Sequence, residues 1–239
     1  MMSPAQRHSA KCAAQAKLKQ RQALDSSDSM HVMAAALEKD VEALHGLTLA
    51  QKVAIKRDTY LPRWMPTVEK YLAEGVIQRN PVLAWCVIWL FDVGDLDAAL
   101  DLADIAIEQG QDTPDALRSN FVTFTADTVL AWAENMAREG QPIEPYFSRT
   151  LTNVTGKWEL YEVIRAKWFK FAGMRQLFDS QGVPRPTVTE DVALLKQVDE
   201  LLAQAHKLHS GCGVGTMRKQ IAARVRALDK KSGETSEKI

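Results

Sequence analysis

The chain has 239 residues, 46% of them hydrophobic, and its formal net charge is zero because thirty Lys/Arg balance thirty Asp/Glu. That length allows an ordinary hydrophobic core without metal or disulfide support, and three widely separated cysteines do not make the framework of a disulfide-rich secreted protein. The longest apolar run, residues 82–91, has about half the length that a membrane-spanning helix needs, and the N-terminus lacks a signal-peptide core, so we expect no membrane association.

The zero net charge hides an uneven distribution. Residues 1–24 contain five Lys/Arg and no acid, whereas residues 80–145 contain twelve Asp/Glu and two Lys/Arg. A basic arm beside an acidic body favours contact with a polyanion through the arm and with a cationic protein surface through the body. This pattern is typical of a binding protein rather than of an enzyme.

Apolar residues recur three and four positions apart along most of the chain, which predicts an all-α fold built of helical hairpins. Residues 1–29 have too few large apolar side chains to bury a face, and we expect a mobile basic N-terminal arm. An amphipathic helix is predicted over 30–44, and Thr48 is placed to cap a helix over 49–60. Two prolines in 61–66 predict a kink, since proline donates no helical hydrogen bond and suits a helix start.

A helical hairpin is predicted on both sides of Gly94. Asn80 caps a helix over 82–93 that ends at Gly94, and Asp95 caps a second helix that runs to Gly110. One face of the second helix is apolar and consists of Leu96, Ala99, Leu100, Ala103 and Ile107. This hairpin resembles one tetratricopeptide-like unit, but no 34-residue repeat follows it, so no solenoid is predicted.

Further helices are predicted over 125–139, around 146–151 and over 157–180, the last of them rich in aromatic residues. Thr187 and Glu190 predict a capping box for the next helix. Its apolar stripe is Leu194, Val198, Leu201, Ala205 and Leu208.

A basic helix is predicted over 216–228. Its apolar stripe is Met217, Ile221, Val225 and Leu228. The chain therefore divides into a basic arm (1–29), a helical core (30–156), a C-terminal oligomerisation region (157–229) and a disordered tail (230–239).

Three segments in a fixed order suggest a family. Residues 3–8 read SPAQRH, residues 61–66 read LPRWMP and residues 89–96 read WLFDVGDL. Together they resemble the small terminase subunit of P2-like tailed phages, a family often labelled "terminase, endonuclease subunit", over most of residues 3–140. The mixed-charge C-terminus departs from the longer Lys/Arg-rich tail that the resemblance leads us to expect.

The resemblance implies a role in DNA packaging, and we separately predict no cofactor. The chain would recognise the packaging site on concatemeric double-stranded viral DNA in the cytoplasm of the infected bacterial host. It would assemble as a ring-shaped homo-oligomer and recruit the large terminase subunit, which would hydrolyse ATP and cut DNA.

Two sets of residues are candidates for DNA contact. Clustered cations suit phosphate groups, and the arm supplies Arg7, Lys11, Lys17, Lys19 and Arg21. The helices around residues 45–46 also fit a helix-turn-helix, whose second helix would present Gln51, Lys52, Lys56 and Arg57. The alternatives are a solvated arm and a plain helical hairpin. Lys167 and Lys170 are candidates for contacts between subunits.

Four acids lie on one face of the helix after Asp95, and we expect them to form a docking surface for a basic partner. They are Asp97, Asp101, Asp104 and Glu108. A nuclease would need such carboxylates around a metal ion, but the lysine or histidine of common nuclease patterns is missing, so a solvated face is the alternative. We predict no catalytic residue.

No metal site is predicted either. His206, His209 and Cys212 have regular spacing but lack a fourth ligand. The glycines of 211–215 lack the Gly-Lys-Ser/Thr ending of a phosphate-binding loop. The two rivals to a DNA-binding terminase subunit are a helical-repeat adaptor that binds only protein and an endonuclease subunit that cuts DNA itself.

Overall fold

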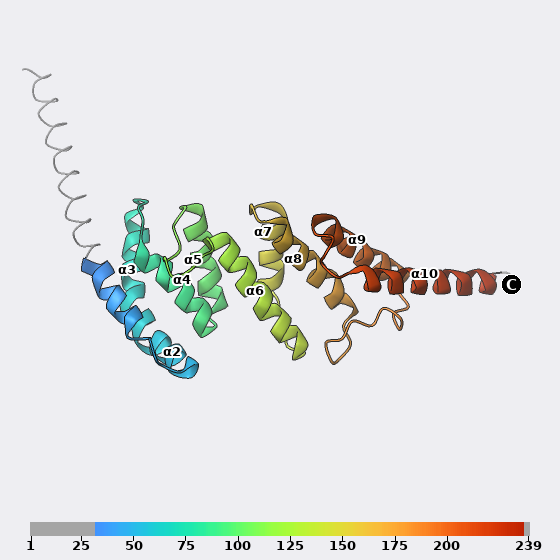
Figure 1. The fold of residues 1–239 in the computed structure, drawn as a ribbon, viewed down its shortest axis with the longest axis horizontal. Helices are drawn as coiled ribbons and strands as arrows, with labels where there is room; N and C mark the ends of the chain where they lie inside the picture. Colours follow the sequence, from blue (N-terminus) through green and yellow to red (C-terminus); the bar gives the residue numbers. More distant parts are fainter. Residues whose placement is uncertain (1–31, 237–239) are drawn as a thin grey trace, which may run out of the picture. The chain divides into compact units, whose positions relative to one another are not determined.

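The computed structural model describes residues 32–236, with side chains from 32 to 231. The predicted basic arm over 1–29 lies outside these residues. Within the described part of the chain every regular element is a helix, and the bridge between Phe178 and Pro184 does not extend into a strand (Figure 1). The all-α prediction is therefore confirmed there. No helix between residues 32 and 236 is long and apolar enough to cross a membrane.

Two compact units divide the chain between Leu117 and Arg118. The predicted boundary after residue 156 separates the helical core from the region expected to mediate oligomerisation, and it stays a prediction. The described part of the first unit begins with a helix over 32–42 and a turn over 43–46.

Thr48 caps α2 (Leu49–Ile55), as the sequence predicts. Its Oγ1 accepts a hydrogen bond from the Gln51 amide at 3.4 Å, and Gln51 Oε1 accepts one from the Thr48 amide at 2.9 Å. This reciprocal capping box satisfies amide groups that the start of a helix leaves open. The predicted end of this helix at Tyr60 needs a correction, because the chain continues as a helix beyond it.

A π-helical turn, η1 (Lys56–Tyr60), joins α2 directly to α3 (Leu61–Glu74). The Leu61 amide donates to the Lys56 carbonyl, five residues back. Pro62 lies in the first turn of α3, directly after the π turn, and donates no backbone hydrogen bond there.

Pro66 lies inside α3, so the prediction that both prolines suit a helix start is wrong for Pro66. Trp64 and Val68, on either side of it in sequence, are buried. Tertiary packing of this face stabilises the helix across the proline, which local rules do not anticipate.

The hairpin predicted around Gly94 is confirmed as α4 (Pro81–Val93) and α5 (Leu96–Glu108). Asn80 Oδ1 accepts from two amides of the first turn of α4, and Asp95 Oδ1 accepts from the Ala98 amide. Gly94 has a φ of 80°, a left-handed conformation that glycine adopts without strain. α4 is buried on nearly all sides, and α5 buries the predicted face except for half-buried Ile107.

A buried polar network fastens the end of α5 to the loop before α4. The Tyr71 hydroxyl donates to Gln109 Oε1 at 2.7 Å, and Gln111 Nε2 donates to the Gln78 carbonyl at 2.8 Å. Gln111 Oε1 accepts from the Asn80 amide at 2.8 Å. These bonds hold the capping residue of α4 in place, because an unpaired polar group at this depth would be costly.

The second unit begins with α6 (Phe121–Arg138), which starts earlier than predicted because Asn120, not Thr125, caps it. Asn120 Oδ1 accepts from the Thr123 amide at 2.9 Å, while Thr125 is fully buried. α7 (Tyr146–Gly156) is longer than the helix predicted around 146–151.

The aromatic helix predicted over 157–180 is shorter than expected: α8 covers Glu162–Met174, and η2 (Arg175–Leu177) adds one 3₁₀ turn. Phe147 of α7 stacks on Trp168 of α8 with ring centroids 5.2 Å apart, and Phe171 meets Phe147 edge to face at 5.4 Å. These rings supply much of the contact between the two helices.

Asp179 organises the loop after η2. Its carboxylate accepts from the amides of Gln181 and Val183 and pairs with Arg185 Nε at 3.0 Å. The backbone hydrogen bonds from Val183 and Gln181, helped by Arg185, hold the pKa of Asp179 below its ordinary value.

The predicted Thr187–Glu190 capping box is wrong. Asp191 caps α9 (Val192–Leu208) by accepting from the Leu194 amide at 3.0 Å, and Thr189 instead bonds the Arg185 carbonyl. The buried stripe of α9 is Leu195, Val198, Leu202 and Ala205. It shares two members with the predicted stripe.

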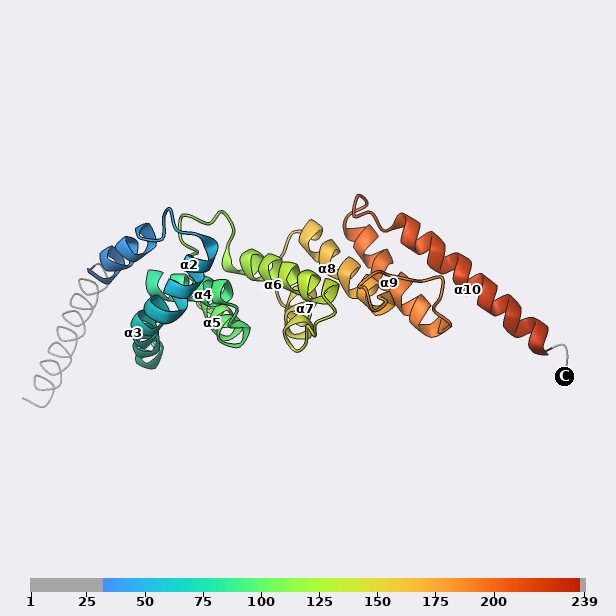
Figure 2. The same ribbon diagram turned by 90° about the horizontal axis from the view of Figure 1, so that it is seen from below.

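The C-terminal helix α10 (Gly215–Ser236) runs beside α9 and then extends beyond it (Figure 2). The predicted apolar stripe is confirmed, with Ile221 buried against the α9 core and the others partly buried there. α10 continues past Leu228 to Ser236, into residues that the sequence assigned to a tail.

Candidate DNA and partner surfaces

The predicted helix-turn-helix residues lie on α2 and η1, and three of the four have partners within the first unit. Gln51 is part of the capping box. Lys56 Nζ lies 2.6 Å from Asp92 Oδ2, and Arg57 Nη2 donates to the Val93 carbonyl at 3.1 Å. Lys52 is half-buried near the end of α2.

Lys56 and Arg57 both reach the C-terminal end of α4. Cations are favoured at a helix C-terminus, where carbonyl groups lack helical partners. Because the Lys56 side chain is only 13% exposed, its ion pair is better shielded from water than an ordinary surface pair. In this arrangement the two cations attach η1 to α4, and DNA contact by them stays a prediction.

The first helix of the predicted motif is attached to α3. Arg63 Nη1 binds both oxygens of Asp40 at 3.0–3.1 Å, and Trp64 Nε1 donates to Asp40 Oδ2 at 2.8 Å. The Arg63 guanidinium also lies over the Trp64 ring, 4.9 Å from its centroid. Asp40 and Asp92 could not be predicted as partners from the sequence, because the cations that they bind are 23 and 36 residues away.

The four acids of α5 share a face, as predicted. Asp97, Asp101 and Glu108 are exposed, and Asp104 is half-buried. Among the described residues, no group of three or more His, Cys, Asp or Glu side chains is arranged to hold a metal ion. Neither the acids of α5 nor the set of His206, His209 and Cys212 therefore forms such a group.

The glycine-rich segment 211–215 forms the turn between α9 and α10. Gly213 has a φ of 77°, and Lys170 Nζ donates to the Cys212 carbonyl at 2.9 Å. Lys167 Nζ lies 3.8 Å from Asp127 Oδ1. The two lysines predicted for contacts between subunits therefore both have partners inside the second unit.

A cavity of about 510 Å³ lies between α6 and α8. Leu130 and Phe171 give it apolar walls, and Asp127, Glu134 and Lys167 place charges of both signs around it. The mixed charge does not select one ligand class.

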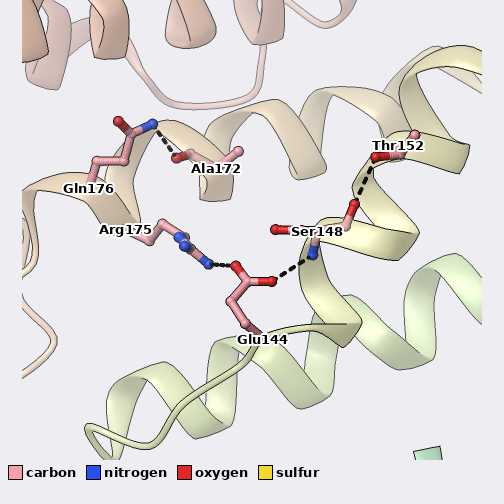
Figure 3. A network of polar contacts seen from close by, with 6 residues as sticks. All are labelled: Glu144, Ser148, Thr152, Ala172, Arg175 and Gln176. Atoms are coloured by element: carbon pink, nitrogen blue, oxygen red, sulfur yellow. Dashed lines mark hydrogen bonds and ion pairs between the residues drawn. The ribbon is translucent and has the colours of Figure 1, made fainter. Parts of the chain in front are cut away.

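A polar network ties the start of α7 to the end of α8 (Figure 3). Glu144 accepts from the Ser148 amide at 3.0 Å and from Arg175 Nη1 at 2.9 Å, while the Arg175 guanidinium lies over the Phe147 ring. Burial would raise the pKa of Glu144, but the hydrogen bonds from Ser148 and Arg175 and the charge of Arg175 together lower it. Glu144 and Arg175 bind partners within the second unit, so this network supports the packing of α7 against α8.

A match to the phage small terminase subunit family covers residues 34–163. The chain belongs to this family. The resemblance noted from three sequence segments is confirmed.

Two curated relatives of this small terminase subunit agree with the assignment. The "Probable terminase, endonuclease subunit" of Haemophilus phage HP1 is 39% identical over 200 residues, which cover 83% of this chain and 71% of the relative. The "Terminase, endonuclease subunit" of Escherichia phage P2 is 28% identical over 177 residues, which cover 73% and 71%. No solved structure matches the chain.

The family match spans the described first unit from residue 34 together with α6, α7 and the first two residues of α8. It includes the contacts of Lys56 and Arg57 with the end of α4 and the acidic face of α5. The α9–α10 hairpin of this small terminase subunit lies beyond the match.

Proposed function

We propose that this small terminase subunit binds the packaging site on concatemeric viral DNA in the host cytoplasm and recruits the large ATPase subunit. The observation that carries the proposal is the family match over residues 34–163. The five cations of residues 1–24 support it, because an arm without acids suits a phosphate backbone. No cofactor enters this function.

In this proposal the basic residues of the arm, α2 and η1 make the contacts with DNA. Arg7, Lys11, Lys17, Lys19 and Arg21 contact phosphate groups. Gln51 and Lys52 are offered to DNA by α2, whereas Lys56 and Arg57 would have to exchange their contacts with Asp92 and Val93 for phosphate.

The acidic face of α5 is proposed as the docking surface for the large subunit. Three of its four acids are exposed on a helix whose opposite face is buried, so the face is presented by a rigid element. We propose a closed homo-oligomer as the working form, with 157–229 supplying contacts between copies. We also propose that the hairpin of α4 and α5 resembles a tetratricopeptide unit.

The test is the salt dependence of duplex DNA binding by the full chain and by a variant in which the five arm cations become Gln. Each phosphate contact contributes about 0.9 to the slope of log affinity against log salt, so the loss of five contacts should lower the slope by up to about 4.5. The loss should be similar for packaging-site and random duplexes, because phosphate contacts carry no sequence information. A wild-type chain that binds no duplex DNA would favour the protein-only adaptor.

The names of the two relatives favour a second candidate, an endonuclease subunit that cuts DNA itself. Incubation of the purified chain with duplex DNA and Mg²⁺ or Mn²⁺ tests it. We expect no cleavage. Cleavage that Asp101→Ala or Asp104→Ala abolishes would establish the nuclease instead.

A further inference from the structure

The outer face of α10 carries cations that the fold directs away from the second unit. Residues 215–231 contain six Lys/Arg and one Asp. At about 100° per residue, Lys219, Arg226 and Lys230 lie within about 40° of each other, on the side away from buried Ile221. Lys219 and Arg226 are exposed.

Two other arginines fix the rotation of α10 about its axis. Arg218 binds Asp199 of α9 through Nε at 2.8 Å and Nη2 at 3.0 Å. Arg224 Nε donates to the Thr189 carbonyl at 2.8 Å. These contacts flank the buried apolar stripe on both sides, and therefore keep Lys219 and Arg226 on the outer face.

The residues between these cations are small. Ala222, Ala223 and Ala227 are exposed, and none of the large exposed apolar side chains of the described residues lies on α10. A protein interface needs apolar or aromatic anchors at its centre, which this face lacks. Cations separated by alanines instead allow the helix to approach a phosphate backbone closely.

The spacing also fits duplex DNA. Seven residues separate Lys219 from Arg226, about 10.5 Å along a helix. One strand of B-DNA presents a phosphate about every 3.4 Å along the axis, so both side chains reach phosphates of one strand at the same time.

We propose that the outer face of α10, through Lys219 and Arg226, is a second, sequence-independent contact for the phosphate backbone of duplex DNA. This proposal rests on the proposed DNA-binding function, and adds to the arm a contact on a folded helix. The arm cations and those of α10 belong to different parts of the sequence, so we expect the two contacts to contribute separately to the salt dependence.

The experiment compares the full wild-type chain with Lys219→Gln/Arg226→Gln on a random-sequence duplex across a salt series. We expect the slope of log affinity against log salt to fall by about 1.8, and affinity near 0.1 M salt to fall on the order of tens-fold. Arg118→Gln/Arg138→Gln is the matched control, because it removes the same charge from exposed positions of the same unit outside 157–229 and should leave the slope nearly unchanged. Far-UV circular dichroism verifies that both variants keep their helices.

Four other outcomes overturn the proposal in different ways. If the wild type binds DNA and the α10 variant keeps the wild-type slope, the inference alone is wrong. Equal losses in the α10 variant and the control would show a general charge effect rather than a site. If DNA binding is unchanged but capture of the large terminase subunit is lost, the face is a protein-docking surface. A wild type that binds no DNA removes the proposed function as well.

Discussion

The two units of the chain use charge in opposite ways. Residues 32–117 contain fourteen Asp/Glu and seven Lys/Arg, whereas residues 118–231 contain twelve and seventeen. In the first unit four of the seven cations lie within 4.0 Å of a carboxylate, namely Lys56, Arg63, Lys70 and Arg79. Lys56 and Arg63 join helices of this unit to each other, and the surplus of acid leaves exposed carboxylates such as Asp97, Asp101 and Glu108.

The second unit has more cations than its own acids can neutralise. Some hold the fold together, as Arg175 and Arg218 do, and others such as Lys157, Lys196 and Lys219 are exposed. The comparison teaches that a count of basic residues does not locate a DNA surface. What matters is which cations remain available after the helices have been joined.

The largest expected effect is the loss of unfolding free energy on replacing a buried tryptophan in each unit. It tests whether the two units, which are separate in their contacts, also unfold separately. Trp89 in α4 and Trp168 in α8 are both fully buried. Trp89→Ala should lower the free energy of unfolding by about 3–5 kcal/mol through lost burial and the cavity that remains. Hydrogen exchange should show the loss in residues 61–108, and Trp168→Ala should show it in α6–α9.

Urea titration gives the size of both losses. If either variant loses protection equally in both units, the chain unfolds as one cooperative body, and the division at residue 117 has no thermodynamic meaning.

Two glycines give the next largest contrast. Gly94 and Gly182 both have left-handed φ angles, of 80° and 70°. A Cβ on Gly94 would meet nothing within 4 Å, whereas one on Gly182 would lie 3.1 Å from the Ala137 carbonyl oxygen. Gly94→Ala should therefore destabilise its unit by about 1–2 kcal/mol, and Gly182→Ala by more.

Thermal unfolding measures the difference between these two variants. A smaller loss for Gly182→Ala would mean that the loop after η2 moves away from α6 at little cost.

Ion pairs within the first unit should differ by a smaller amount. Lys56 and Asp92 are 2.6 Å apart, with the Lys56 side chain 13% exposed, whereas Lys70 and Glu74 are 4.0 Å apart and largely exposed. Double-mutant cycles should give about 1 kcal/mol for the first pair and no more than about 0.5 kcal/mol for the second. Equal coupling would show that η1 does not depend on its contact with α4.

The smallest expected effect is the contribution of Glu144 to the stability of the second unit at low pH. The pKa of Glu144 is lowered from its ordinary value of 4.5, so its contribution to stability is present above pH 4.5 and is lost as the pH falls through the folded pKa. Glu144→Gln should reduce the loss of stability on acidification below that pH. Urea midpoints measured along a pH series test this, and parallel curves for both proteins would contradict it.

Features within one helical turn could be predicted from the sequence. The caps at Thr48, Asn80 and Asp95 accept hydrogen bonds from amides two or three residues later in the chain. At the stop, the Gly94 amide donates to carbonyl groups three and four residues earlier. Later in the chain the capping box predicted at Thr187 was wrong, because Asp191 caps α9. The helix predicted from residue 125 begins earlier, because Asn120 caps α6. Periodicity alone does not decide between competitors that differ by one turn.

Long-range partners could not be predicted. Lys56 and Arg57 look like DNA-binding cations in sequence, but the structure pairs them with the end of α4, 36 residues later. The same limit concealed Arg218 and Arg224, whose contacts with α9 and the preceding loop decide which cations of α10 face outward.

The π-helical turn η1 also determines the direction in which the side chains of α3 point about the helix axis. One residue corresponds to about 100° of rotation, so the extra residue of a π turn changes which side chains face inward after residue 56. Tyr60, which lies 5.2 Å from Trp89 ring to ring, is buried as a result. Deleting Thr59 would restore regular α-helical winding but turn α2 relative to α3, so the predicted DNA-facing residues and Tyr60 could not both keep their positions.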